Sequence, residues 1–231
     1  MKTKMLFSTT LLSLSVILAG CGGNEESATG SEDTTKEEAP KSAEQKEVSN
    51  EIPEPKQDET GNIILTVAGQ KVEKDGYTVE LLKIKDINEI VEIAPLTVTI
   101  KDIKLLKYSK MSDDFKEELK WASDADHIGD ETTYLQINYD AENKEEKNIE
   151  WYDLMNVVTD KGEQIDGQLK DFISDVDSDS EFLGKVKKEY TDGFILKDGD
   201  INKVKLIFGY TQDSTSYDEI TPEQQVEYTF K

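Results

Sequence analysis

The segment 96–105, LTVTIKDIKL, decides the fold class of this chain. Its apolar side chains at Leu96, Val98 and Ile100 alternate with polar ones, and large apolar residues continue to Leu105. A period of two places alternate side chains on opposite faces of an extended strand. The segment therefore predicts a β-strand with one face in a hydrophobic core.

The same period recurs through residues 61–231. Four further segments carry it: 77–84, 135–139, 204–210 and 226–230. Within the first of these the pattern slips by one residue after Leu81, as a β-bulge or a strand that passes from one face to the other would make it do. Roughly seven to nine short strands without strand–helix alternation predict a mostly β domain, and we expect an antiparallel β-sandwich.

One short helix interrupts this pattern. Ser112 can cap its start, and Asp113 and Asp114 suit the positive end of the helix dipole. The helical pattern ends by Ala122, and residues 123–130 have the composition of a loop. The fold class expected is thus mostly β with a single short helix.

The N-terminus has the features of a signal peptide. Residues 1–20 carry Lys2 and Lys4, then a run of apolar and small residues. The motif LAGC at 18–21 resembles the bacterial lipobox, in which the cysteine is diacylated and becomes the first mature residue. Cys21 is the only cysteine, so it has no disulfide partner within the chain. We expect lipidation at Cys21, the alternative being an ordinary signal peptide that happens to carry a cysteine.

Residues 21–60 differ in composition from the rest. Beyond Cys21 they are rich in Glu, Ser, Thr, Lys and Pro and contain no aromatic residue. Such a segment buries too little apolar surface to offset the entropy of ordering. We therefore expect a lipidated cysteine and a disordered acidic linker over 21–60, and one folded domain over 61–231.

Charge restricts the possible partners. The chain has 50 acidic residues against 27 basic ones, all lysine, and a formal net charge of -23. This charge repels nucleic acid and anionic lipid headgroups, so we expect no nucleic-acid partner. It suits a domain held off an anionic membrane or one that meets cations.

Two segments carry a family resemblance. They are YLQINYDAENKEEKNIEWYDLMNVVTDKGEQI at 134–165 and DGFILKDGDINKVKLIFGY at 192–210. Their order of strands and turns resembles the DUF4352-type immunoglobulin-like lipoprotein domains of Gram-positive bacteria. The resemblance implies an immunoglobulin-like β-sandwich, and it implies no catalytic residues.

An acidic loop is the candidate metal site. Asp175, Asp177 and Asp179 alternate as the first ligands of a calcium loop do. The EF-hand pattern then fails, because Ser180 stands where Gly is needed and Val186 where a bidentate Glu is needed. A different calcium loop and a solvated acidic loop both remain open, with the solvated loop favoured.

Other chemistry-bearing residues are few. His127 is the only histidine, which argues against a zinc site or a Ser-His-Asp device, and we interpret it as a loop residue. Trp121 and Trp151 could contribute to a platform for a sugar or peptide. Trp151 begins a strand and is expected in the core, so Trp121 is the candidate for exposure.

These observations predict a lipid-anchored protein on the extracytoplasmic face of the cell membrane. Its domain is expected to bind an envelope protein or a wall polymer. The alternative function is a small cell-wall hydrolase or peptidase that uses acidic residues. A solute receptor of the two-lobed α/β type is disfavoured, because the chain shows no strand–helix alternation.

Overall fold

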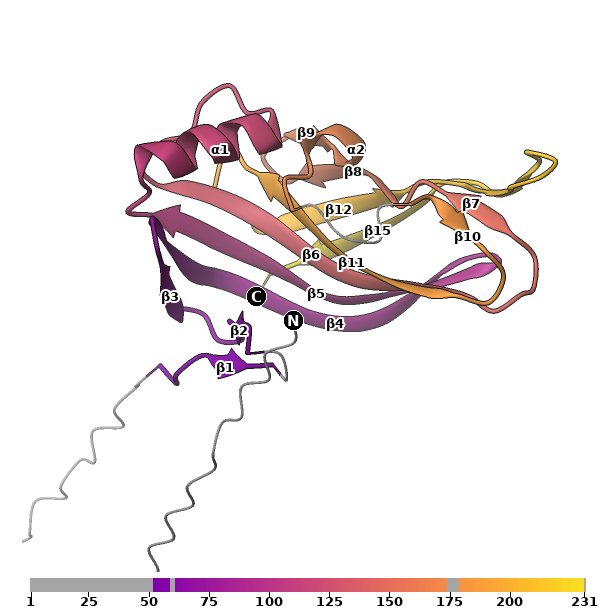
Figure 1. Ribbon diagram of the computed structural model, residues 1–231, viewed down its shortest axis with the longest axis horizontal. Coiled ribbons are helices and arrows are strands. Elements are labelled where there is room, and N and C mark those ends of the chain that lie inside the picture. Colours follow the sequence, from indigo (N-terminus) through magenta and orange to yellow (C-terminus); the bar gives the residue numbers. More distant parts are fainter. Residues whose placement is uncertain (1–51, 59–60, 174–178, 231) are drawn as a thin grey trace, which may run out of the picture. The chain divides into compact units, whose positions relative to one another are not determined.

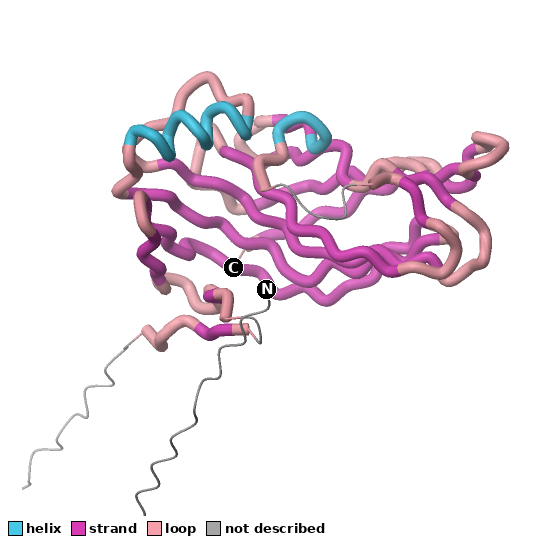
Figure 2. The backbone as a smooth tube through the Cα atoms, viewed as in Figure 1, coloured by secondary structure: helices cyan, strands magenta, loops and turns pink. Residues whose placement is uncertain are grey.

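The computed structural model describes residues 52–58, 61–173 and 179–230. Strands account for most of this part of the chain, and the two helices lie near one another (Figure 2). Every strand pairing in it is antiparallel. The predicted mostly β, antiparallel sandwich is confirmed.

The larger sheet has five strands in the order β11-β6-β5-β4-β3 (Figure 1). Its strands are β3 (Lys71–Lys74), β4 (Tyr77–Ile93), β5 (Leu96–Ser109), β6 (Thr132–Asn143) and β11 (Lys187–Ile195). Three of the strands that sequence periodicity predicts, at 77–84, 96–105 and 135–139, lie next to one another in this sheet. Each is longer in the structure than its periodic segment.

The remaining strands form two four-stranded sheets and a small hairpin. The sheet with order β15-β12-β8-β9 consists of β8 (Leu154–Thr159), β9 (Gln164–Asp166), β12 (Lys203–Phe208) and β15 (Gln224–Thr229). The sheet with order β10-β7-β13-β14 consists of β7 (Ile149–Trp151), β10 (Glu181–Phe182), β13 (Thr211–Asp213) and β14 (Glu219–Thr221). The hairpin pairs β1 (Lys56–Gln57) with β2 (Ile63–Ile64).

The main core lies between the larger sheet and the two four-stranded sheets. On β5, Leu96, Val98 and Ile100 have no exposed surface, as the alternation predicts. Ile103 lies on the same face although it is three residues beyond Ile100. A register shift against β6 between Ile100 and Asp102 accommodates the extra residue. The bulge keeps the apolar side chains of β5 in one core.

The pattern slip on β4 also corresponds to an irregularity. The pairing of β4 with β5 shifts register between Leu81 and Lys83. Leu81 packs in a second hydrophobic cluster, whereas Leu82 packs against the main core. Of the two explanations for the slip, the structure has the β-bulge, which divides the side chains of β4 between two clusters.

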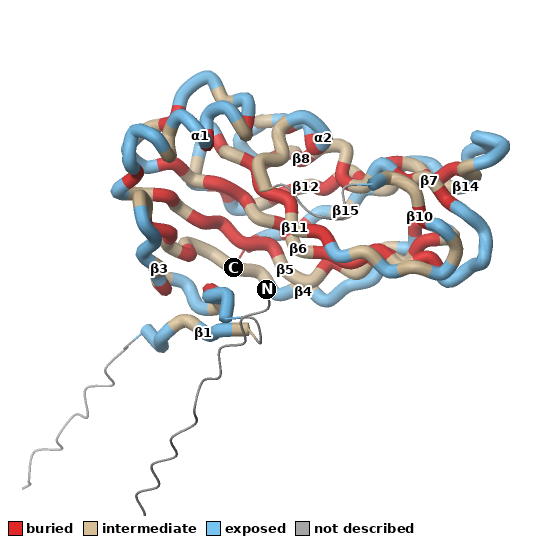
Figure 3. Tube along the Cα trace, in the orientation of Figure 1, coloured by how far each residue is buried: buried red, intermediate tan, exposed pale blue. Residues whose placement is uncertain are grey.

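The second cluster covers the other face of the larger sheet, called here its outer face. It joins Leu81 and Tyr108 to Phe115 and Leu119 of α1 (Asp113–Ser123). Ser112 caps α1, because its Oγ accepts a hydrogen bond from the Phe115 N–H at 3.2 Å. Side chains on both faces of the sheet are buried, and Figure 3 marks the buried positions along β5 and β6. The helix thus exists where its apolar side can cover the outer face.

The expectation of a single helix was wrong. A second one, α2 (Gly167–Lys170), has only one turn. Its cap is Asp166, whose Oδ1 accepts hydrogen bonds from the backbone N–H groups of Gln168 and Leu169 at 3.0 and 3.1 Å. Because four residues contain barely one helical period, the sequence has no repeated apolar pattern that would predict α2.

The end of the predicted linker contacts the domain. Gln70, 2% exposed, donates from Nε2 to the carbonyl oxygens of Pro53 and Glu54 at 2.9 and 3.2 Å. Its Oε1 accepts from the N–H groups of Thr66 and Val67 at 2.7 and 2.9 Å. Residues 52–58 thus belong structurally to the folded domain, although their composition matches the linker.

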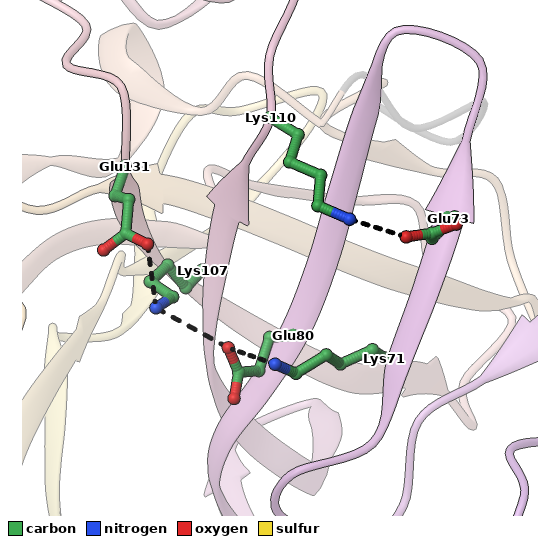
Figure 4. A network of polar contacts seen from close by, with 6 residues as sticks. All are labelled: Lys71, Glu73, Glu80, Lys107, Lys110 and Glu131. Atoms are coloured by element: carbon green, nitrogen blue, oxygen red, sulfur yellow. Dashed lines mark hydrogen bonds and ion pairs between the residues drawn. The ribbon is translucent and has the colours of Figure 1, made fainter.

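Charged side chains tie neighbouring strands together at one end of the larger sheet (Figure 4). Glu80 accepts ion pairs from Lys71 and Lys107 at 3.4 and 3.6 Å, and Lys107 also pairs with Glu131 at 3.3 Å. The contacts join β3, β4 and β5 to Glu131, which directly precedes β6. These are cross-strand pairs of the kind that add modestly to sheet stability.

Candidate functional site

A cleft opens beside the two helices. Its volume is about 690 Å³. Its walls come from the loop after α1, the start of β6, the strand β9 with the turn before it, and the connection from β11 to β12. Loops at the end of a sandwich are where domains of this architecture usually carry function. We call this cavity the helix-end cleft.

The end of α1 forms one wall of the helix-end cleft. Asp124 follows α1 with a left-handed backbone (φ 47°) and ends the helix. The ammonium group of Lys170, in α2, donates to the Asp124 carbonyl oxygen at 2.6 Å and contacts its carboxylate. This contact fastens α2 to the C-terminus of α1 and fixes the width of the cleft at that point.

The floor and the opposite wall are held by the sheets. Ile165 of β9 and Leu196 after β11 are both 6% exposed and give the floor apolar side chains. The Leu196 N–H donates to the Thr133 carbonyl oxygen at 3.0 Å. The Lys197 N–H donates to Oε2 of Glu163 at 3.1 Å. The cleft therefore combines an apolar base with a polar rim.

The rim is predominantly acidic. Five carboxylates face two lysines: Asp124, Asp126, Glu131, Glu163 and Asp166 against Lys170 and Lys197. Lys170 is already paired with Asp124, and Glu131 is paired with Lys107 outside the cleft. A concave site with excess negative charge raises the local concentration of cationic groups. The arrangement suits a ligand that carries amines over an apolar body.

His127 lies on the wall of the helix-end cleft and is exposed. The interpretation of His127 as a loop residue agrees with its position between α1 and β6. Its imidazole adds a polar group to a wall that is otherwise acidic. An exposed imidazole of this kind can bind a ligand at the surface, but it has no buried partner that would orient it for catalysis in the described part of the chain.

The two tryptophans separate as expected. Trp121 of α1 is 87% exposed, whereas Trp151 of β7 has no exposed surface. The indole N–H of Trp151 donates to the Gly209 carbonyl oxygen at 2.9 Å, which satisfies it inside the core. Trp121 is not among the residues that line the helix-end cleft, but it stands on α1 three residues before Asp124.

The candidate calcium loop falls partly outside the described residues, which leave out Asp175 and Asp177. Asp179 is exposed, and its Oδ1 accepts a hydrogen bond from the Glu181 N–H at 3.0 Å. Within 52–58, 61–173 and 179–230, no group of three His, Cys, Asp or Glu residues is placed to hold a metal ion. The two alternatives for this loop, a calcium site and the favoured solvated acidic loop, therefore stay untested.

Cys21 also lies outside the described residues. Within the described ranges, neither helix has the length and apolar character that crossing a membrane requires. Lipidation at Cys21 therefore remains a prediction from the sequence.

Among the described residues, the carboxyl group of Asp153 has a raised pKa, as general acids need, and it does not line the helix-end cleft. Burial raises the pKa of Asp153, although the hydrogen bond from Gln168 Nε2 at 2.6 Å acts in the opposite direction. Since Asp153 is fixed by Gln168, and the Gly209 N–H donates to its carbonyl oxygen at 2.7 Å, its position is structural.

Sequence reasoning found the loop after α1 but not its partners in the cleft. Glu163, Lys170 and Lys197 come from three separate segments that only the packing of β9, α2 and the β11–β12 connection brings together. The one local signal was Asp166, a residue type that commonly caps helices, just before α2.

Comparison with known proteins gives few relatives. No family model matches the chain. It is 25% identical over 194 residues to the uncharacterized protein YdhF of Bacillus subtilis (strain 168), a match that covers 81% of this chain and 77% of YdhF. The crystal structure of a functionally unknown protein from Listeria monocytogenes EGD-e aligns with this chain at a TM-score of 0.45 and 14% sequence identity. The alignment covers 66% of this chain and 86% of that protein. The chain is thus similar, over most of its length, to a protein that is itself uncharacterized.

Proposed function

We infer that this chain is a membrane-anchored extracytoplasmic lipoprotein whose β-sandwich is a binding module of the cell envelope. The lipobox-like LAGC at 18–21 supports the anchor, and the resemblance to DUF4352-type immunoglobulin-like domains supports the class of module. Two acyl chains, as diacylation supplies, hold a protein on a membrane far more firmly than one. The linker after Cys21 would let the domain reach partners away from the bilayer.

The observation that carries the binding role is the acidic helix-end cleft. Its excess of carboxylates over lysines and its apolar floor suit a partner with amine groups. An envelope protein with an exposed lysine-rich segment and a wall polymer that bears amines both have this chemistry. We assign the cleft to the interaction, with Asp126, Glu131 and Glu163 as the carboxylates that meet the partner.

The anchor is tested by metabolic labelling with a fatty acid. The wild-type protein is expected to incorporate label and to fractionate with membranes, and the Cys21→Ser variant is expected to do neither. Equal labelling of both proteins, or no labelling of the wild type, would contradict the anchor.

The binding role is tested by affinity capture from solubilised membranes and from purified wall material. The variant Asp126→Asn/Glu131→Gln/Glu163→Gln is expected to lose the partner that wild type retains. Its matched control, Glu92→Gln/Glu145→Gln/Glu223→Gln, neutralises three exposed carboxylates that do not line the cleft and is expected to retain it. Capture of the same material by all three proteins would refute the cleft as the site. Release of soluble wall fragments that depends on the three cleft carboxylates would replace binding with hydrolysis.

A further inference from the structure

A second cavity lies on the outer face of the larger sheet. It has a volume of about 680 Å³ and shares no lining residue with the helix-end cleft, so it does not depend on the function proposed for that cleft. Its base is formed by side chains of β4, β5, β6 and β11, and residues 62–65 contribute a wall above them. We call it the sheet-face groove.

One half of the sheet-face groove is a hydrogen-bonded polar lattice. Across β5 and β6, Asp102 lies opposite Asn138, and Lys104 lies opposite Gln136. Asn138 donates from Nδ2 to Asp102 Oδ1 at 2.7 Å, and its Oδ1 accepts from Gln136 Nε2 at 3.2 Å and from Thr191 Oγ1 at 3.0 Å. These contacts hold planar amide groups in fixed orientations on a rigid sheet, as specific recognition requires.

The charges of this half are compensated within the protein. Lys104, 8% exposed, pairs with Asp102 at 3.5 Å. Lys101 pairs with Asp140 at 2.5 Å, and Lys187 with the same carboxylate at 2.7 Å. A phosphate or carboxylate ligand would have to compete with these carboxylates inside a strongly acidic protein. The groove therefore suits a neutral ligand.

The other half is apolar. Val79, Leu106 and Tyr134 are at most 8% exposed and line it from the sheet, and Leu65 lines it from above. Tyr134 stacks on Tyr108 with ring centroids 4.6 Å apart, which makes this wall rigid. A ligand here must present polar groups on one side and an apolar face on the other.

The groove offers such a ligand both a hydrogen-bond acceptor and hydrogen-bond donors. Gln136 uses one amide hydrogen for Asn138, and within the described part of the chain its carbonyl oxygen accepts no hydrogen bond. Lys104 has one ion pair for its three donors, again counting described residues only. A ligand whose groups both donate and accept would use all of these.

We propose that the sheet-face groove binds a neutral N-acetylated sugar unit. Sugar hydroxyls donate and accept, the ring C–H faces and the acetamide methyl are apolar, and the acetamide matches the side-chain amides of Gln136 and Asn138. A small number of oriented polar groups beside an apolar wall is the usual composition of a small-ligand site. An extended peptide is disfavoured, because peptides that bind to sheets pair with backbone groups at a strand edge, whereas this groove presents side chains in the middle of a sheet face.

The test is a titration of the 231-residue chain carrying Cys21→Ser with chitotriose, the neutral trimer of N-acetylglucosamine, followed by NMR. The side-chain amide signals of Gln136 and Asn138 are expected to shift in a saturable way. Those of Gln164 and Gln168, which lie on β9 and α2, are expected to stay in place. Absence of a saturable shift up to about 10 mM sugar would overturn the proposal, since that concentration reaches even weak sites.

Variants make the assignment specific. Gln136→Ala is expected to weaken the affinity for chitotriose by about tenfold or more, while Gln225→Ala, an exposed glutamine on β15, leaves it unchanged. Lys104→Met keeps the length of the side chain without its charge and is expected to weaken binding with the fold intact. Unchanged affinity in both groove variants would overturn the proposal. So would a capped triglycine peptide that shifts the Gln136 and Asn138 amides when chitotriose does not.

Discussion

The two faces of the larger sheet differ in what covers them and in which side chains they carry. Its inner face is covered by other sheets, and Ile100, Ile103 and Ile137 have no exposed surface there. Its outer face changes along the strands from aromatic residues beneath α1 to the polar pair Asp102 and Lys104 in the sheet-face groove. Both faces belong to the same strands, whose side chains alternate between the faces except at the bulges.

The difference shows how the covering of a sheet face limits its composition. A face closed by a second sheet is mostly apolar, because a polar group buried without a partner costs free energy. A polar group on it therefore has a partner, as Asp192 has in the Tyr139 hydroxyl. A face that is covered only at one end can keep polar groups, provided that they bond to one another. We therefore expect substitutions on the inner face to change stability and substitutions in the outer groove to change binding.

The largest effect is expected at Trp151. Trp151→Ala should lower the free energy of unfolding by about 3 to 5 kcal/mol, because it opens a cavity in the core and leaves the Gly209 carbonyl without its donor. Urea unfolding of the purified domain measures this. Trp121→Ala is the control, since that side chain is 87% exposed and should cost less than about 0.5 kcal/mol. Similar losses of unfolding free energy in the two variants would contradict the assignment of Trp151 to the core and Trp121 to the surface.

The second effect depends on pH and concerns the outer face. Burial raises the pKa of Tyr108 to about 12, from a usual value of 10.0. A raised folded-state pKa stabilises the protein below pH 10, and this contribution, as much as about 2 to 3 kcal/mol, is lost as the pH rises through 12. Tyr108→Phe should therefore lose less stability than wild type between pH 10 and 12, as followed by urea unfolding.

Tyr217→Phe is the control for Tyr108, because Tyr217 is 69% exposed and belongs to neither hydrophobic cluster. On the inner face, burial raises the pKa of Tyr139 further, and Asp192, which accepts its hydrogen bond at 2.9 Å, adds to the effect. Its phenolate absorbance should thus develop only on unfolding. A Tyr108→Phe protein with the alkaline slope of wild type would contradict the role of the buried outer tyrosine.

The third effect concerns the attachment of residues 52–58. Gln70→Ala should cost about 1 to 3 kcal/mol, because it leaves the N–H groups of Thr66 and Val67 without their acceptor. Hydrogen exchange at these two amides should accelerate and limited proteolysis should cut nearby. Gln57→Ala in the β1 strand is exposed and should alter neither measurement. Equal protection in wild type and Gln70→Ala would show that Gln70 does not fasten the segment.

The smallest effect is expected from the ion pairs of Figure 4. Glu80→Gln removes the carboxylate shared by Lys71 and Lys107 and should cost about 0.2 to 1 kcal/mol at low salt. In about 1 M salt the difference from wild type should disappear, because screening shortens the range of the interaction. Glu92→Gln, an exposed carboxylate elsewhere on β4, should show no loss under either condition. If Glu80→Gln loses the same stability at low and at high salt, Glu80 contributes through packing and not through its charge.

Periodicity found the elements whose side chains alternate regularly. It predicted the strands at 96–105 and 135–139, the helix after Ser112 and the bulge near Leu81, and it assigned Trp151 to the core. It missed α2 and the shortest strands, which contain too few residues for a period to repeat. Composition placed residues 52–58 in the linker. Their attachment depends on hydrogen bonds from the one side chain of Gln70, which a count of residue types cannot predict.

The sequence by itself determined the mostly β class and the acidic charge, and it alone supports the predicted lipoprotein signal, because each of these is a local pattern or a sum over residues. Only the tertiary structure decided which polar residues meet. Asp102 and Asn138 are 36 residues apart, and Asn138 and Thr191 are 53 apart, yet strand pairing joins them in one groove. Contacts of this kind depend on register and sheet order, which are set by how whole faces pack against one another.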